Sequence, residues 1–258
     1  MITENFVSHS ADEPEGADLS PLLITAPHGG YDVVDGAPKR TKGVLDGDQF
    51  TKECAIAIAD TCGAYLVICE AQRLYVDCNR GVLSEKVLNA DVAPAQAYMS
   101  DTLPVEPTAD DEVVNPAASV YELFHATIAN RIAKLAKASK LALLLDIHGN
   151  SFKSLKGLVY VTGCSMQATA GRPVRAELCA LMQAEGLQTN SDERENGDGV
   201  FTGGFVTHHY GREVPNCCAL QLEIHVDFRK SADEARDCGR RIGRAVANYL
   251  VSFSAPQE

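Results

Sequence analysis

The stretch LALLLDIH at residues 141–148 is a short apolar run that ends on a histidine, and two other runs share its pattern. Residues 21–27 lead into His28, and residues 218–222 lead into Glu223. Such runs are typical of buried strands, and in open α/β sheets ligands bind just beyond the carboxyl ends of the strands. Two imidazoles and a carboxylate at such ends indicate a metal hydrolase.

The composition of the chain limits its partners and its compartment. In 258 residues there are 23 Lys and Arg against 35 Asp and Glu, a net charge of -12, which argues against nucleic acid or an anionic membrane surface as a partner. Nine cysteines without a CxxC motif are typical of reduced thiols, and the N-terminus lacks a signal-peptide pattern. No apolar run reaches transmembrane length. We therefore expect a cytoplasmic protein.

The order of the predicted elements indicates a single-domain, three-layer α/β/α fold with a mostly parallel mixed sheet. The domain is expected to cover residues 19–252, between a flexible arm at 1–18 and a tail at 253–258. Residues 81–115 are rich in proline and acidic residues and are expected to form a surface excursion or lid. We predict strands at 21–27, 64–70, 73–78, 141–147, 157–162, 203–208 and 219–225, and helices at 48–61, 116–139, 173–186 and 231–250.

A catalytic zinc site needs a third ligand beside His28 and His148. Asp48 is the first choice and Asp46 the second. Asp48 is also a good helix N-cap residue, and that alternative is about equally probable from sequence alone. Each histidine taken singly is also compatible with a structural role at a strand end, so the argument depends on the pair.

Glu223 stands among apolar residues, where a carboxylate is costly to bury unless it is paired. Its functional interpretation is a general base that takes a proton from water and passes it to the leaving amine. The alternative is a structural ion pair with an arginine. His225 shares the same strand face and is a weaker candidate, more simply explained as a half-exposed strand residue.

Arg73 and Arg80 lie at the two ends of the segment RLYVDCNR, residues 73–80. Arginine binds a carboxylate through two parallel hydrogen bonds, so a pair beside a metal site suggests an anionic substrate. The alternative is a set of surface salt bridges, which contribute little. Asp77, in the same segment, is a weaker candidate for orienting a ligand histidine.

Taken together, these motifs resemble the N-formylglutamate amidohydrolase family, over about residues 21–228. The resemblance implies a phosphorylase/hydrolase-like α/β fold, related to zinc carboxypeptidases and aspartoacylase, with one zinc ion per chain. It also implies hydrolysis of N-formyl-L-glutamate to formate and glutamate. The motifs are PHGG at 27–30, Asp48, RLYVDCNR at 73–80, LDIH at 145–148, GGF at 203–205, YG at 210–211 and QLE at 221–223.

The resemblance implies roles for individual residues. The expected metal ligands are His28, Asp48 and His148. Glu223 is the expected general base, and Arg73 is expected to polarise the scissile carbonyl. The expected substrate-binding residues are Asn79, Arg80, His208 and Tyr210, with Asn79 and Arg80 holding the substrate carboxylate. Gln72, Thr202 and the pair His208-His209 depart from the family pattern in the substrate-facing segments.

Two other functions are compatible with the same residues. One is a carboxypeptidase or amidase that acts on a larger acyl or peptidyl substrate, which the size of the pocket would distinguish. The other is a non-catalytic solute-binding protein on the same scaffold, which the presence of all four of His28, Asp48, His148 and Glu223 disfavours. We expect a small anionic N-acyl amino acid as the substrate, and a monomer or small homo-oligomer.

Overall fold

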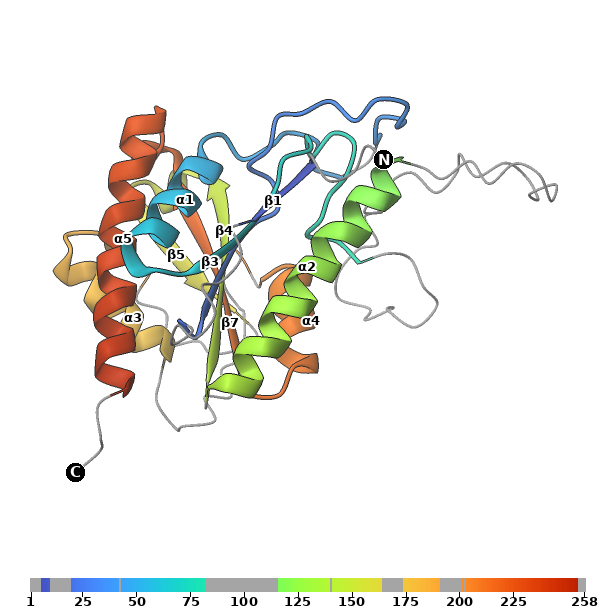
Figure 1. Cartoon of the computed structure of the whole chain (residues 1–258). Coiled ribbons are helices and arrows are strands. Elements are labelled where there is room, and N and C mark those ends of the chain that lie inside the picture. The colour runs from blue at the N-terminus through green and yellow to red at the C-terminus, as the bar shows by residue number, and fades with distance from the viewer. Residues whose placement is uncertain are drawn as a thin grey trace.

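The computed structural model describes residues 6–9, 20–41, 43–81, 116–139, 141–163, 174–190, 201 and 203–254. At its centre is a seven-stranded mixed sheet of order β1-β3-β2-β4-β7-β5-β6 (Figure 1). The central strands β3, β2, β4 and β7 are parallel, whereas β1 and β5 run antiparallel to their neighbours β3 and β7. The strands are β1 (Val7–His9), β2 (Leu22–Ala26), β3 (Tyr65–Cys69), β4 (Ala142–Asn150), β5 (Leu158–Thr162), β6 (Gln188–Thr189) and β7 (Cys217–His225).

Helices cover both faces of the sheet, so the three-layer α/β/α prediction is confirmed. Helices α1, α3 and α5 pack on one face, and α2 and α4 pack on the other (Figure 1). The helices are α1 (Thr51–Cys62), α2 (Pro116–Ala138), α3 (Val174–Ala184), α4 (Phe205–Glu213) and α5 (Ala232–Ser254), with short 3₁₀ helices η2 (Lys153–Leu155) and η3 (Val226–Phe228).

Burial on both faces explains why the central strands are continuous apolar runs. In β2, Leu22 and Ile24 enter the core beneath α1 and α5, while Leu23 enters the core beneath α2. Side chains of a strand alternate between the faces of the sheet, so a strand covered on both faces needs apolar residues at every position. Within β2 the only polar side chain is Thr25, one residue before the strand ends, and the other polar side chains gather beyond the end of the strand.

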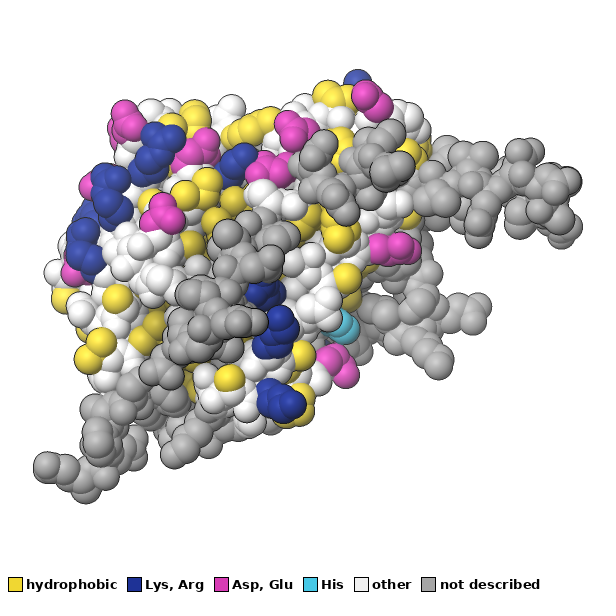
Figure 2. Space-filling view, in the orientation of Figure 1, with side chains coloured by type: hydrophobic (Ala, Val, Ile, Leu, Met, Phe, Trp, Pro, Cys, Tyr) yellow, Lys and Arg dark blue, Asp and Glu magenta, His cyan; other side chains and the backbone are white. Residues whose placement is uncertain are grey.

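Two hydrogen bonds that involve side chains cap the start of α5. Ser231 Oγ accepts a hydrogen bond from the Glu234 N–H, and Glu234 Oε2 accepts one from the Lys230 N–H. Basic side chains line the outer edge formed by α5 in Figure 2. Arg236 and Arg240 there pair with acidic residues three positions earlier on the same helix. This row is therefore neutralised locally.

Two predicted strands are wrong. Residues 73–78 form turns instead of a strand, with the Tyr75 N–H bonded to the Gln72 carbonyl at 2.9 Å. Residues 205–208 form the first turn of α4, and Gly204 before them is the N-cap residue, whose N–H donates to Thr207 Oγ1 at 3.1 Å. Turn hydrogen bonds in the first segment and helical ones in the second satisfy the backbone groups that a sheet ladder would otherwise pair.

The N-terminal arm contributes a strand to the sheet. Within the expected flexible arm, Val7–His9 forms β1 and pairs with β3, which the polar sequence did not indicate. Apart from Gly81, the excursion expected at 81–115 lies outside the described residues. In the part of the chain that the structure describes, no helix has both the length and the apolar character needed to cross a membrane.

Candidate active site

Three neighbouring parallel strands bring the predicted site residues to one edge of the sheet. Register pairs Thr25 of β2 with Asp146 of β4, and His148 of β4 with Glu223 of β7. His28 follows the end of β2, so its side chain and those of His148 and Glu223 reach the same edge. The edge is the carboxyl end of the parallel strands, where α/β proteins bind their ligands.

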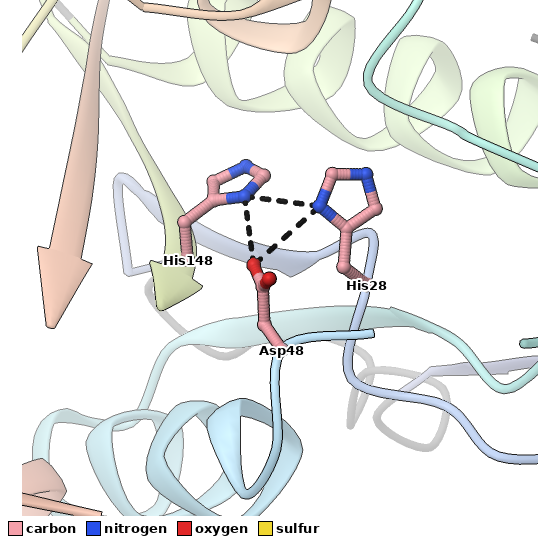
Figure 3. A group of neighbouring side chains, drawn as sticks. All are labelled: His28, Asp48 and His148. Atoms are coloured by element: carbon pink, nitrogen blue, oxygen red, sulfur yellow. Dashed lines mark hydrogen bonds and ion pairs between the residues drawn. The ribbon is translucent and has the colours of Figure 1, made fainter. Parts of the chain in front are cut away.

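Two histidines and one aspartate converge at this edge (Figure 3). The Nδ1 atoms of His28 and His148 are 3.1 Å apart. Oδ2 of Asp48 lies 3.5 Å from Nδ1 of His28 and 3.2 Å from Nδ1 of His148. Within the described ranges, this is the one group of three or more His, Cys, Asp or Glu side chains close enough to share an ion.

The loop before α1 directs Asp48 into this group and away from the helix. Phe50, not Asp48, is the N-cap residue, and it has φ +60°, a left-handed conformation that bulky residues seldom adopt. Such a conformation costs about 1–3 kcal/mol and is common at functional sites. Asp48 Oδ2 instead accepts the Gly149 N–H at 3.1 Å. The N-cap alternative for Asp48 is therefore wrong.

A second carboxylate holds the far side of each imidazole. Nε2 of His28 lies 2.6 Å from Oδ1 of Asp77, and Nε2 of His148 lies 2.8 Å from Oδ2 of Asp146. A carboxylate accepts hydrogen bonds, so each Nε2 carries the proton and each Nδ1 presents its lone pair to the centre. Asp146 is held in turn by Thr25 Oγ1 at 2.7 Å.

Asp146 was missed by the sequence reasoning, although a signal for it exists. Residues two apart on a strand project to the same face, and Asp146 stands two positions before His148. Asp77 was predicted in this role, and the structure brings it to His28. Arg40 lies in a loop without recognisable periodicity, and no sequence signal pointed to its contact with Asp77.

The converging donor atoms fit a divalent cation. Three lone pairs directed at one point repel each other unless a positive charge lies between them. Ligands at about 2.0–2.1 Å from a tetrahedral zinc ion are about 3.4 Å from each other, and the observed separations are 3.1, 3.2 and 3.5 Å. Imidazole and carboxylate ligands also accept manganese or iron. Asp46, the second choice, lies on the pocket wall outside this group.

Without a metal, a proton takes the place of the cation. Burial disfavours a charged His148, but the carboxylates of Asp146 and Asp48 outweigh it and raise the pKa of His148 to about 10. Burial would raise the pKa of Asp48, but hydrogen bonds from His148 and His28 hold it well below its usual range. The pocket therefore favours positive charge at the point where the three donor atoms meet.

The group opens into a pocket of about 480 Å³, and Glu223 lies in the wall of that pocket. Glu223 is 4% exposed, and its Oε1 accepts a hydrogen bond from Gln221 Nε2 at 2.7 Å. Burial raises the pKa of Glu223 to about 7, with the nearby Asp48 acting in the same direction and His148 opposing it. A carboxylate with a pKa near neutrality can both accept and return a proton.

The two arginines of the 73–80 segment surround Asp77. Arg73 Nε donates to Asp77 Oδ2 at 3.0 Å, and Arg80 Nε lies 4.0 Å from the same oxygen. Arg73 Nη1 also lies 3.7 Å from Asp48 Oδ1. Arg73 is buried and Arg80 is partly exposed, and both line the pocket. A set of surface salt bridges, the alternative, does not describe this buried cluster.

Asn79 lies between the histidines and α4. Its Oδ1 accepts the Val206 N–H at 2.9 Å, and its Nδ2 lies 2.9 Å from Nε2 of His148. A Cβ atom at position 204 would lie 2.0 Å from Asn79 Nδ2, which explains the glycine there. Asn79 lines the pocket with its Oδ1 engaged by α4, and Nε2 of His148, which carries a proton, cannot accept a hydrogen bond from Nδ2.

Three predicted or considered residues lie outside the pocket lining. Tyr210 is buried, and its hydroxyl donates to the His125 carbonyl at 2.9 Å. His208 lies on α4 with its ring against Gly203. His225 is 4% exposed and its Nδ1 accepts the Asp227 N–H, so the expectation of a half-exposed residue is wrong.

The sequence matches a known family over most of its length. A family model described as N-formylglutamate amidohydrolase matches residues 20–228. The chain belongs to the N-formylglutamate amidohydrolase family. An N-formylglutamate deformylase of Pseudomonas putida is 27% identical over 218 residues, which cover 79% of each protein. The chain is accordingly a hydrolase that acts on an amide bond.

Solved structures support the fold. The crystal structure of N-formylglutamate amidohydrolase from Ralstonia eutropha JMP134 superposes with a TM-score of 0.67 at 15% identity, covering 95% of this chain and 97% of that one. A metallo-carboxypeptidase from Burkholderia cenocepacia superposes with a TM-score of 0.51 at 11% identity, covering 96% of this chain and 62% of that one. The expected carboxypeptidase-like fold class is thus confirmed.

Proposed function

We propose that the protein is a zinc-dependent amidohydrolase that cleaves N-formyl-L-glutamate to formate and glutamate. The observation that carries the proposal is the convergence of two Nδ1 atoms and one carboxylate oxygen beside Glu223 in one pocket. The name of the Pseudomonas putida relative, N-formylglutamate deformylase, supports the choice of substrate. His28, Asp48 and His148 would hold one zinc ion.

Different residues would serve proton transfer and charge stabilisation during hydrolysis of the amide. Zinc, when bound, supplies a Lewis acid and lowers the pKa of water toward neutrality. Glu223, whose pKa is near 7, takes the proton from the attacking water and delivers it to the amine that leaves. Arg73, buried beside Asp48, would stabilise the negative charge that develops on the scissile carbonyl oxygen.

Arg80 is the best-placed residue for holding the substrate carboxylate. Its side chain is 26% exposed and lines the pocket, so its guanidinium is accessible to a ligand. A bidentate pair with a carboxylate fixes both position and orientation, which brings the amide close to the reacting groups. Asn79 lies next to Arg80 and would contribute the remaining hydrogen-bonding capacity of its Nδ2 group.

Hydrolysis of N-formyl-L-glutamate by zinc-loaded protein tests the proposal. We expect formate and glutamate to be released in equal amounts, activity to disappear after chelation, and added zinc to restore it. Substitution of His148 by alanine should prevent that restoration. If zinc-loaded protein with one ion per chain released neither product, the proposed substrate would be wrong.

The size of the pocket favours a second candidate, an amidase for larger N-acyl amino acids. A pocket of about 480 Å³ is within the range typical of drug-sized ligands, whereas N-formylglutamate has only about a dozen non-hydrogen atoms. Phe152, Phe201 and Val44 add apolar surface to the pocket lining. Phe152 is 52% exposed, and its ring centroid is 5.5 Å from that of Phe201.

A comparison of N-formyl with longer N-acyl glutamates separates the two candidates. For the second candidate, kcat/KM should rise with acyl length, and Phe152→Ala should reduce it for the long substrates only. For the first candidate, the formyl compound should be the best substrate, and Phe152→Ala should change little. Val33→Ala is a suitable control, because Val33 is likewise 52% exposed but does not line this pocket.

A further inference from the structure

Arg229 lies behind the reaction centre with its guanidinium directed at three main-chain carbonyls. The residue follows η3 and is 6% exposed. Its Nε donates to the carbonyl of Ile224 at 3.0 Å, and its Nη2 donates to the carbonyl of Asn150 at 3.2 Å. Its Nη1 donates to the carbonyl of Gln49, which is 180 residues away in sequence.

Each of these carbonyls belongs to a segment that carries a functional side chain. Gln49 follows Asp48, and Ile224 follows Glu223. Asn150 is two positions after His148. Strands β4 and β7 are already joined by the sheet, but the loop that carries Asp48 is not part of it. A single guanidinium therefore links that loop to the ends of both strands.

The backbone at Gly149 is adapted to this arrangement. A Cβ atom at Gly149 would lie 2.3 Å from Cζ of Arg229 and 2.4 Å from its Nη2. Any side chain at this position would displace the guanidinium. Gly149 lies in β4 between His148 and Asn150, whose carbonyl Arg229 binds. The position of the Arg229 guanidinium therefore requires glycine at position 149.

Lysine cannot replace arginine in this role. The guanidinium is planar and holds its N–H groups in fixed, diverging directions, whereas a lysine ammonium is a single point on a flexible stem. Three carbonyls on three separate segments need three fixed directions. The positive charge also lies near Asp48 and Glu223, and it lines the same pocket.

We propose that Arg229 is a positioning residue that holds Asp48, His148 and Glu223 in the geometry needed for metal binding and proton transfer. This inference rests on the proposed function of those three residues. Misplacement of reacting groups by about 1 Å lowers rates by about 100-fold. Loss of the link should therefore lower both zinc affinity and kcat while leaving the substrate clamp at Arg80 unchanged.

Arg229→Lys is the main test, measured by zinc competition with a chromophoric chelator and by steady-state kinetics. Loss of residues that support metal ligands typically costs about 10- to 100-fold in metal affinity or activity, and we expect falls of this size in both zinc affinity and kcat. KM should stay within about twofold, because the groups that bind substrate are untouched. Gly149→Ala, which keeps Arg229 but displaces it, should give the same pattern.

Arg175→Lys is a matched control. Arg175 is partly buried and, like Arg229, bonds main-chain carbonyls, those of Val161 and Asn190, but it does not line the pocket. We expect Arg175→Lys to keep the zinc affinity and kcat of the unmodified protein. In Arg229→Ala, added guanidinium ion should restore part of kcat in a saturable manner, whereas methylammonium should not.

The outcomes separate a positioning role from a purely structural one. If Arg229→Lys and Gly149→Ala lower the melting temperature but keep zinc affinity and kcat per folded molecule, the inference is overturned. It is equally overturned if Arg175→Lys lowers zinc affinity and kcat as much as Arg229→Lys does. Zinc affinity is measured without substrate, so this measurement tests the role of Arg229 even if N-formyl-L-glutamate proves to be the wrong substrate.

Discussion

His28 and Asp77 form a hydrogen bond of 2.6 Å between Nε2 and Oδ1, and both side chains are nearly inaccessible to solvent. This contact fixes which nitrogen of His28 carries its proton, and so it directs the Nδ1 lone pair toward His148 and Asp48. The arginines around Asp77 lower its pKa together with His28, although burial acts in the opposite direction. Asp77, which is not itself in the group of three, thus sets both the orientation and the tautomer of His28.

Asp77→Asn should weaken zinc binding without removing a ligand. The amide cannot accept the His28 proton as strongly, so the ring loses both its orientation and its preferred tautomer. We expect zinc affinity to fall about 10- to 100-fold, as measured by competition with a chelator. Asp60→Asn, an exposed position on α1, is the control and should leave zinc affinity unchanged. Equal affinities in the two variants would contradict the role given to Asp77.

Glu223→Gln should abolish turnover while keeping the metal. Glutamine preserves the shape of the side chain but cannot accept a proton, and general acid–base catalysis typically contributes about 10²–10⁴-fold. We expect kcat to fall by that factor, with zinc content per chain unchanged by elemental analysis. A variant that retains its activity would remove Glu223 from the general-base role. Loss of zinc from the variant would point to a ligand role instead.

The metal-free protein should lose stability as pH rises above about 6.5. The folded protein holds the Glu223 proton with a pKa of about 7, against an ordinary value of 4.5, so this contribution is fully present below pH 4.5 and is lost as pH rises through 7. His148 acts in the same sense, because its pKa rises from 6.5 to about 10. His125 acts in the opposite sense between pH 4 and 6.5, because burial lowers its pKa from 6.5 to about 4. The carboxyl groups of Asp48 and Asp77 also act in the opposite sense, but only below pH 3.8.

Urea denaturation of the metal-free protein between pH 4.5 and 9 measures this dependence. Glu223 alone should account for about 3 kcal/mol in the free energy of unfolding, at 1.36 kcal/mol for each pKa unit. Below pH 7 the opposing contribution of His125 remains in Glu223→Gln, so the variant should gain stability with rising pH relative to the unmodified protein, and it should keep the decline above pH 7 that His148 causes. Curves of equal slope below pH 7 would contradict the assignment of Glu223, and a metal-free protein that becomes more stable above pH 7 would contradict that of His148.

Arg80→Lys should affect substrate binding more than the chemical step. Lysine keeps the charge but loses the bidentate geometry, so KM for the anionic substrate should rise about tenfold, a cost of about 1.4 kcal/mol. The kcat value should change much less, because Arg80 does not contact the converging donor atoms. Arg212→Lys, a mostly exposed change on α4, is the control. An unchanged KM would refute the clamp.

Sequence alone determined the fold class and most of the residues that converge on the pocket. The apolar runs before His28, His148 and Glu223 marked three parallel strands, because a strand buried on both faces needs apolar residues throughout. The polar residue after each run then marked the edge of the sheet. These are local signals, because the polar residue follows the apolar run directly in the chain and so lies at the end of the strand that the run forms.

The tertiary structure alone decided which residues support these side chains. Arg40 and Arg229 act through contacts with segments far away in the sequence, and such contacts depend on how loops cross the end of the sheet. The tertiary structure also shows that Phe50, not Asp48, is the N-cap residue of α1, and that Tyr210 does not line the pocket. Local propensity does not encode the direction of a side chain in a loop, because that direction depends on the long-range packing around it.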